Sequence, residues 1–172
     1  TYHHNWYDHS DSRHPRIRTC SVHSYNNYFD GNAKYGVGVT MGASAFVENN
    51  YFRNCKDPMM SSGQGTDALG EGTFSGEPGG IIKAYNNVIV GASSYIPYAE
   101  NNTSFDAYEV SSPSETVPSS VTALSGGSTY NNFDTDSSIM YSYTADAPED
   151  VPSIVTAHAG RVDGGDFQWK FD

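Results

Sequence analysis

The chain has 172 residues, which suits one domain large enough to bury a core, and it is rich in glycine and tyrosine. Many aromatic and asparagine residues with very little leucine favour strands and turns over helices, so we expect an all-β protein. The net charge of −11 argues against nucleic acid and against an anionic membrane surface as partners. No apolar run approaches the roughly 20 residues that a membrane span needs.

A cationic cluster lies near the start of the chain, where Arg13, Arg16 and Arg18 fall within six residues. Side chains alternate between faces in an extended segment, so Arg16 and Arg18 are expected on one side and Ile17 on the other. Guanidinium groups bind carboxylates through two parallel hydrogen bonds. The cluster therefore predicts a site for successive carboxylates of an anionic ligand. The competing interpretation is a solvated basic strand whose arginines form surface salt bridges.

An asparagine motif followed by apolar or aromatic residues recurs along the chain. The second asparagine of each motif gives spacings of 22, 23, 37 and 45 residues. These spacings predict a repeating unit of about 20–25 residues, as in solenoids, with an insertion between Asp57 and Gly80 that lengthens the third spacing. The motifs are Asn5, Asn26-Asn27, Asn49-Asn50, Asn86-Asn87 and Asn131-Asn132.

Short strand candidates precede three of these doublets, at residues 21–25, 45–48 and 80–85. Asparagine tolerates left-handed backbone geometry and bonds to nearby backbone groups, so it suits a bend between strands. Stacked bends would place one side-chain amide above the next. A strand, an asparagine bend and a second strand in each unit predict a single-stranded parallel β-helix. The alternative is coincidence in an asparagine-rich chain.

The last third of the chain is less regular. Residues 110–128 predict an irregular segment that lies over the coils, and residues 148–159 predict a short helix with Pro152 in its first turn. Residues 166–171 alternate apolar and polar side chains, as a last packed strand would. We interpret these parts as an irregular C-terminal covering with a short helix, within one domain that spans residues 1–172.

The cysteines and histidines offer weaker signals. Cys20 and Cys55 permit one disulfide between neighbouring coils without requiring it. A metal site built from N-terminal histidines competes with packed or surface histidines, which we favour because the spacing matches no strong zinc pattern. These histidines are His3, His4, His9 and His14.

The arginine cluster and the first doublet together carry a family resemblance. Residues 13–18 read R-H-P-R-I-R and residues 22–27 read V-H-S-Y-N-N. They resemble the R-x-P-R-x-R and V-H-x-Y-N-N signature of the main bacterial pectate lyase family, polysaccharide lyase family 1. Residues 47–52 are similar to the next coil of that family. The likeness covers most of the chain and is weakest from about residue 100 to 138.

The resemblance implies a right-handed parallel β-helix, with this chain as its C-terminal part, in a secreted pectate lyase. Such an enzyme uses Ca²⁺ and cleaves α-1,4-linked polygalacturonate by β-elimination. By resemblance, Arg13 removes the C5 proton of the sugar beyond the scissile bond and Arg18 binds the carboxylate of that sugar. Arg16 is expected to support this site or contact the substrate, and His23 to make structural hydrogen bonds.

One departure from the family concerns calcium. In the family the acidic calcium ligands lie on coils before the arginine signature, whereas only twelve residues precede Arg13 here. We therefore assign no metal ligand in this chain and expect a missing N-terminal segment or a second chain to complete the β-helix. Two alternatives follow: a non-catalytic β-helix module that binds acidic polysaccharide, and a pectin lyase that acts on the methyl-esterified polymer.

Overall fold

The computed structural model describes residues 1–69 and 74–160, and it contains three sheets whose named strands all pair in parallel. The first sheet has the order β1 (Tyr2–His3), β4 (Ser21–Tyr25), β7 (Ser44–Glu48), β10 (Ile81–Tyr85) and β12 (Tyr108–Glu109). The second has the order β11 (Val88–Val90), β8 (Tyr51–Arg53), β5 (Tyr28–Asp30) and β2 (Trp6–Asp8). The third has the order β3 (Arg16–Arg18), β6 (Tyr35–Thr40) and β9 (Asp57–Ser61).

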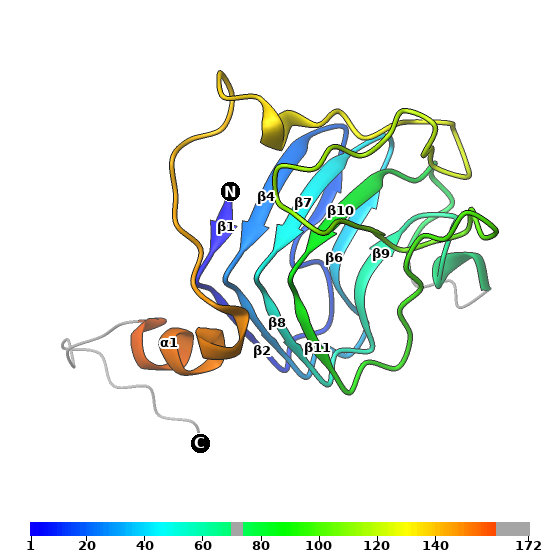
Figure 1. Ribbon diagram of the computed structural model, residues 1–172. Coiled ribbons are helices and arrows are strands. Elements are labelled where there is room, and N and C mark those ends of the chain that lie inside the picture. The colour runs from blue at the N-terminus through cyan, green and yellow to red at the C-terminus, as the bar shows by residue number, and fades with distance from the viewer. Residues whose placement is uncertain (70–73, 161–172) are drawn as a thin grey trace.

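The chain visits the three sheets in turn, so each circuit is one coil of a solenoid (Figure 1). Equivalent residues of successive coils lie in register: Val22 pairs with Ala45, and Ala45 with Ile82. These side chains are buried inside the coil, as are the stacked rings of Phe29 and Phe52, whose centroids lie 4.3 Å apart. The predicted all-β class and parallel β-helix are confirmed.

The asparagine doublets form the bends between the first and second sheets. The first asparagine of each doublet adopts left-handed geometry, with φ of 50° at Asn26, 49° at Asn49 and 49° at Asn86. The second asparagine belongs to a ladder in which the backbone N–H and the side-chain amide of one coil both donate to the side-chain oxygen of the next. The ladder runs Asn5, Asn27, Asn50, Asn87, and its bonds measure 2.9–3.1 Å.

Two details of the repeat prediction are wrong. The doublet at Asn131-Asn132 is not a coil bend, because Asn132 precedes a 3-10 helix (Phe133–Thr135) in the covering. The insertion does not begin at Asp57, since Asp57–Ser61 forms β9 and pairs with β6. Pro58 and two buried methionines give β9 no alternating pattern, which hid the strand in the sequence. The insertion therefore starts after Ser61 and includes a 3-10 helix (Asp67–Leu69).

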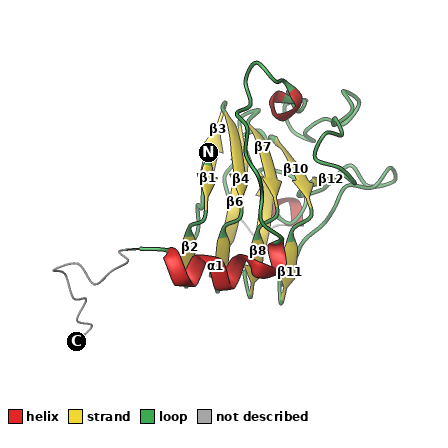
Figure 2. Cartoon of the chain, turned by 60° about the vertical axis from the view of Figure 1, so that its left-hand side comes forward, coloured by secondary structure: helices red, strands yellow, loops and turns green. Residues whose placement is uncertain are grey.

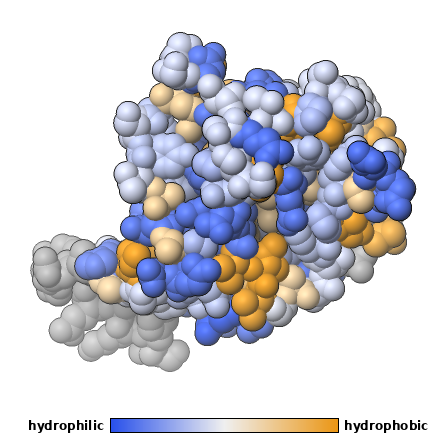
Figure 3. Space-filling view, viewed as in Figure 1, coloured by the Kyte–Doolittle hydropathy of each residue, from blue (hydrophilic) through white to orange (hydrophobic). Residues whose placement is uncertain are grey.

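The irregular covering is confirmed, and Figure 2 shows it as loops beside the strands. Lys83 on β10 fixes part of it, because its buried Nζ donates to Asp134 Oδ2 at 2.6 Å and to the Pro113 carbonyl at 2.8 Å. The face seen in Figure 3 is largely hydrophilic, with apolar side chains in separate patches.

The predicted helix is also confirmed. A 3-10 turn (Pro148–Asp150) leads into α1 (Val151–His158), which packs Val151 and Val155 against Tyr28 of the second sheet. No helix in the described part of the chain has the length and apolar character of a membrane span. The strand predicted at residues 166–171 lies outside the described residues.

The permitted disulfide is not formed, and both cysteines are free thiols. Cys20 is exposed between β3 and β4, whereas Cys55 is buried between β8 and β9. The two residues therefore lie at different corners of the coil. The Cys55 thiol instead contacts Asn32 Oδ1 at 3.4 Å and the Phe29 carbonyl at 3.5 Å.

Candidate functional site

Two of the three arginines lie on strand β3, at the edge of the third sheet. Ile17 points into the core with 6% of its surface exposed, so Arg16 and Arg18 project from the outer face, as the alternation predicts. Their register partners on β6 are Gly38 and Thr40. The two guanidinium groups are thereby brought side by side on the outside of the coil.

Arg13 precedes the strand and is exposed. Its backbone is left-handed, with φ of 71°, and its Nη1 donates to Ser12 Oγ at 3.0 Å. No carboxylate lies within ion-pairing distance of Arg13 in the described residues, in contrast to Arg16 and Arg18. Its guanidinium is therefore open to solvent and forms no ion pair with a carboxylate among the described residues.

Arg16 and Arg18 share one carboxylate, that of Glu77. Arg16 Nη2 and Arg18 Nε each donate to Glu77 Oε2 at 3.1 Å, and Arg18 Nε also reaches Oε1 at 3.4 Å. Desolvation by the surrounding chain would raise the pKa of Glu77. The hydrogen bonds and positive charges of Arg18 and Arg16 outweigh that effect and lower its pKa. Glu77 is therefore an anion held between two cations.

The two arginines differ in their access to solvent. The Arg16 side chain is 12% exposed and its guanidinium lies 4.9 Å above the centre of the Phe74 ring, whereas Arg18 is 46% exposed. Phe74 packs directly over Gly38, where a Cβ atom would lie 2.2 Å from the ring. Glycine at this position makes room for the ring that supports Arg16. Arg18 is thus the member of the pair that a large ligand can reach.

Tyr35 of β6 lies beneath the arginines. It is fully buried, and its hydroxyl is one of the buried polar atoms for which the described residues provide no hydrogen-bond partner. Burial raises the pKa of Tyr35, and the charges of Arg13, Arg16 and Arg18 oppose that rise. All three guanidinium groups therefore lie close enough to act on one hydroxyl, which gathers the predicted cluster in one region.

Sequence reasoning missed Tyr35, Phe74 and Glu77. Phe74 and Glu77 come from the insertion, which has no apolar period, and Glu77 meets Arg16 across 61 sequence positions. A single carboxylate in a polar loop gives no local signal of such a contact.

His23 makes the structural hydrogen bonds expected of it, on the first sheet. Its Nε2 lies 2.8 Å from Glu48 Oε1 and its Nδ1 lies 2.8 Å from the Tyr141 hydroxyl. Tyr143 donates to the same Glu48 oxygen. His23 and Glu48 are buried, and their bonds to Tyr141 and Tyr143 tie the covering to the coils, so the network supports the fold.

The N-terminal histidines do not converge on a metal. His3 contacts His4 at 2.9 Å, His9 contacts Asp8, and His14 contacts Ser10 Oγ at 2.9 Å.

A different group, formed by Asp8, His9 and Asp30, brings its ligand atoms within 4.8 Å of one another. Both oxygens of Asp30 accept hydrogen bonds from Arg53, at 2.8 and 2.6 Å. Ca²⁺ takes six to eight oxygen ligands. The remaining carboxylate, that of Asp8, contacts His9, and the carboxylates of Glu77 and Asp11 are held by cations as well. These four carboxylates therefore do not form the oxygen-rich ligand set that Ca²⁺ prefers.

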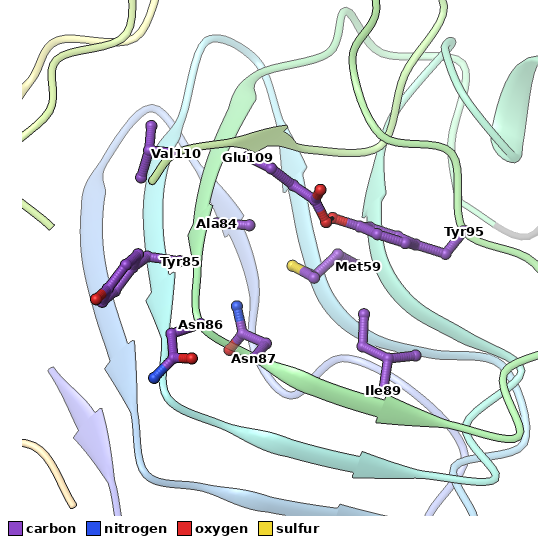
Figure 4. A pocket seen from close by; sticks show the side chains of 9 residues that line it. All are labelled: Met59, Ala84, Tyr85, Asn86, Asn87, Ile89, Tyr95, Glu109 and Val110. Carbon is purple, nitrogen blue, oxygen red and sulfur yellow. Dashed lines mark hydrogen bonds between the residues drawn. The ribbon is translucent and has the colours of Figure 1, made fainter. Parts of the chain in front are cut away.

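A cavity of about 180 Å³ lies at the last coil, away from the arginines. Figure 4 shows Met59, Ile89 and Tyr95 around it, with the Tyr95 hydroxyl against Glu109. That hydroxyl donates to Glu109 Oε1 at 3.0 Å. The cavity contains no cation among its lining residues, so it does not suit an acidic ligand. The arginine cluster remains the better candidate.

Comparison with known proteins gives matches that extend over most of the chain. The sequence profile of a family described as pectate lyase matches residues 1–163. Pectate lyase 3 of Pectobacterium atrosepticum is 28% identical over 160 residues, which make up 93% of this chain and 36% of that enzyme. Pectate trisaccharide-lyase of Bacillus licheniformis is 46% identical over 61 residues, or 36% of this chain and 18% of that enzyme. The chain thus spans 36% or less of the length of these relatives.

Solved structures give the same result. Pectate lyase II of Xanthomonas campestris superposes with a TM-score of 0.57 at 29% identity, covering 92% of this chain and 39% of that one. A pectate lyase of Bacillus sp. N165, solved in complex with trigalacturonate, superposes with a TM-score of 0.53 at 25% identity and the same coverage.

Proposed function

Because this chain belongs to the pectate lyase family, we propose that it carries the arginine part of an active site that cleaves polygalacturonate by β-elimination. The observation that carries the proposal is the pair Arg16 and Arg18, which project together from β3 and bind a single carboxylate. A galacturonate unit presents the same chemical group, and each unit of the polymer adds another. The bacterial enzyme solved with trigalacturonate supports this class of ligand.

The proposed reaction needs a base and a stabilised anion. The base removes the C5 proton, the electrons of that bond form a C4–C5 double bond, and the C4–O4 bond breaks. The leaving oxygen then takes up a proton. The C5 proton is weakly acidic, because its removal places a second negative charge beside the carboxylate. A guanidinium group bound to that carboxylate stabilises the developing charge.

The geometry supports a division of roles. Arg18 is exposed and would bind the carboxylate of the sugar that loses its proton. Arg16 is mostly buried and would support that site. Arg13 is exposed, without a carboxylate partner in the described residues, and would remove the C5 proton. Free arginine has a pKa above about 12, so a base of this kind would work best in alkaline solution.

Calcium dependence is part of the proposal, on the strength of the family resemblance. When bound, Ca²⁺ would neutralise substrate carboxylates. By the family resemblance its ligands would come from coils that precede the arginine signature, and the carboxylates of Asp30, Glu77 and Asp11 are already paired with cations. Strands β1, β2 and β3 each lie at an open edge of a sheet, which supports further coils from a preceding segment or a second chain. We also propose that the protein acts outside the cell.

The other candidate is a non-catalytic module that binds acidic polysaccharide, since the binding of a carboxylate by Arg16 and Arg18 does not itself require catalysis. The absorbance of the unsaturated product distinguishes these functions when it is measured on pectate and on esterified pectin, with and without a chelator. Product that disappears on chelation supports a pectate lyase. Binding without product supports the module, and chelator-resistant cleavage of esterified pectin indicates a pectin lyase.

A further inference from the structure

The anion site of the arginine pair is already filled by the chain itself. Glu77 Oε2 accepts from Arg16 and from Arg18 at 3.1 Å each, and the hydroxyl groups of Thr40 and Ser75 lie 3.5 and 3.4 Å from the same oxygen. Two guanidinium groups on one carboxylate oxygen form a strong anion site. Glu77 comes from the insertion and lies 61 positions from Arg16, so the contact is a feature of the tertiary fold.

We propose that Glu77 occupies the place of a galacturonate carboxylate, and that polygalacturonate binds by displacing the Glu77 side chain from the arginines. This inference rests on the proposed function, since it takes the arginine pair as the site for uronate groups. Glu77 then acts as an internal competitor that sets the affinity for the polymer.

The backbone beside Glu77 is held in place, so the side chain alone has to move. The Glu77 carbonyl accepts a hydrogen bond from Ser62 Oγ at 2.7 Å. The next carbonyl, that of Pro78, accepts from the Met41 N–H at 2.6 Å and from Thr40 Oγ1 at 2.8 Å. The side chain of Glu77 is 37% exposed, so its carboxylate already borders on solvent. Space therefore exists for the carboxylate to rotate into solvent.

The burial of Arg16 explains why a replaceable counter-ion is useful. Its side chain is 12% exposed, and its Nε is a buried atom for which the described residues provide no partner. A buried cation without a counter-ion is unfavourable. Glu77 supplies the negative charge when the polymer is absent, and a substrate carboxylate supplies it when the polymer is bound. Arg18 is exposed enough to take the incoming group first.

The test is calorimetric titration of the purified protein with trigalacturonate at low ionic strength. An internal competitor divides the intrinsic dissociation constant by the fraction of molecules in which the site is open, so binding appears weaker. With about one molecule in ten open, Glu77→Gln binds trigalacturonate about tenfold more tightly than wild type. Glu77→Ala shifts the dissociation constant in the same direction and guards against an effect specific to glutamine.

Asp11→Asn is the matched control for the change in charge. Asp11 lies two positions before Arg13 and forms an exposed ion pair with Lys34 at 3.0 Å, away from the arginine pair. We expect less than about a twofold change from this variant, because exposed charges are well screened. Thermal unfolding of each variant confirms that it is folded.

Unchanged or weaker binding in both Glu77 variants overturns the inference, because Glu77 would then orient the arginines instead of competing with substrate. Tighter binding in the Glu77 variants, with no unsaturated product from any variant, supports the inference and removes the lyase function. Absence of binding by wild type and by Glu77→Gln alike overturns both proposals.

Discussion

The asparagine ladder makes a stability prediction whose size follows from its hydrogen bonds. In Asn50→Ala the side-chain donors to the carbonyls of Ser24 and Glu48 and to Asn87 Oδ1 are lost, as is the oxygen that accepts from Asn27. Asn50 is fully buried, so water does not replace these partners. Each unsatisfied buried group costs about 1–3 kcal/mol, and partial relaxation leaves an expected loss of about 3–5 kcal/mol.

That loss corresponds to a fall in melting temperature of about 10 °C for a domain of this size. Urea and thermal unfolding followed by circular dichroism measure it. Asn131→Ala is the control, because Asn131 is exposed and lies outside the ladder, with a side-chain bond to Ser21 Oγ. It should lose less than about 1 kcal/mol. Equal losses in the two variants would refute the claim that the ladder stabilises the coils.

Two further predictions concern cysteine reactivity and pH. The exposed Cys20 thiol should react with a thiol reagent in the folded protein. Burial raises the pKa of the Cys55 thiol to about 11, so Cys55 should react only after denaturation. Two unreactive thiols in the denatured, unreduced protein would contradict this prediction. Burial raises the pKa of Asp106 from 3.8 to about 6 although Thr66 and Ile96 donate to it. The folded protein then binds more protons between these two values, so the free energy of unfolding should fall by up to about 3 kcal/mol as the pH rises from about 4 to about 6. Urea unfolding measured across this pH range should show a smaller change of the unfolding free energy with pH in Asp106→Asn than in wild type. The same pH dependence in both proteins would contradict the raised pKa of Asp106.

The repeating parts of the fold were predictable because they follow local rules. The doublets at Asn26, Asn49 and Asn86 mark left-handed bends, which asparagine tolerates better than most residues. The alternation around Ile17 placed Arg16 and Arg18 on one face, because a strand has a period of two residues.

The remaining parts depend on contacts that no local pattern encodes. The hydrogen bond from Arg16 to Glu77 depends on the path of a long insertion. The position of the Arg16 guanidinium also depends on the Phe74 ring, which packs over Gly38. The doublet Asn131-Asn132 has the same composition as the doublets at the coil bends, but it lies in the C-terminal covering. Composition alone therefore did not distinguish a coil bend from a turn in the covering.

The central claim is tested most directly by the release of unsaturated product from polygalacturonate in the presence of calcium, by wild type and by Arg13→Lys, each joined to the calcium-binding coils that the family places before the arginine signature. We predict product from wild type and a rate lower by about 10²- to 10⁴-fold in Arg13→Lys, since lysine keeps the charge without the guanidine base. Arg53→Lys, which alters an ion pair on the second sheet, should leave the rate unchanged. Full activity in a folded Arg13→Lys protein would contradict the account.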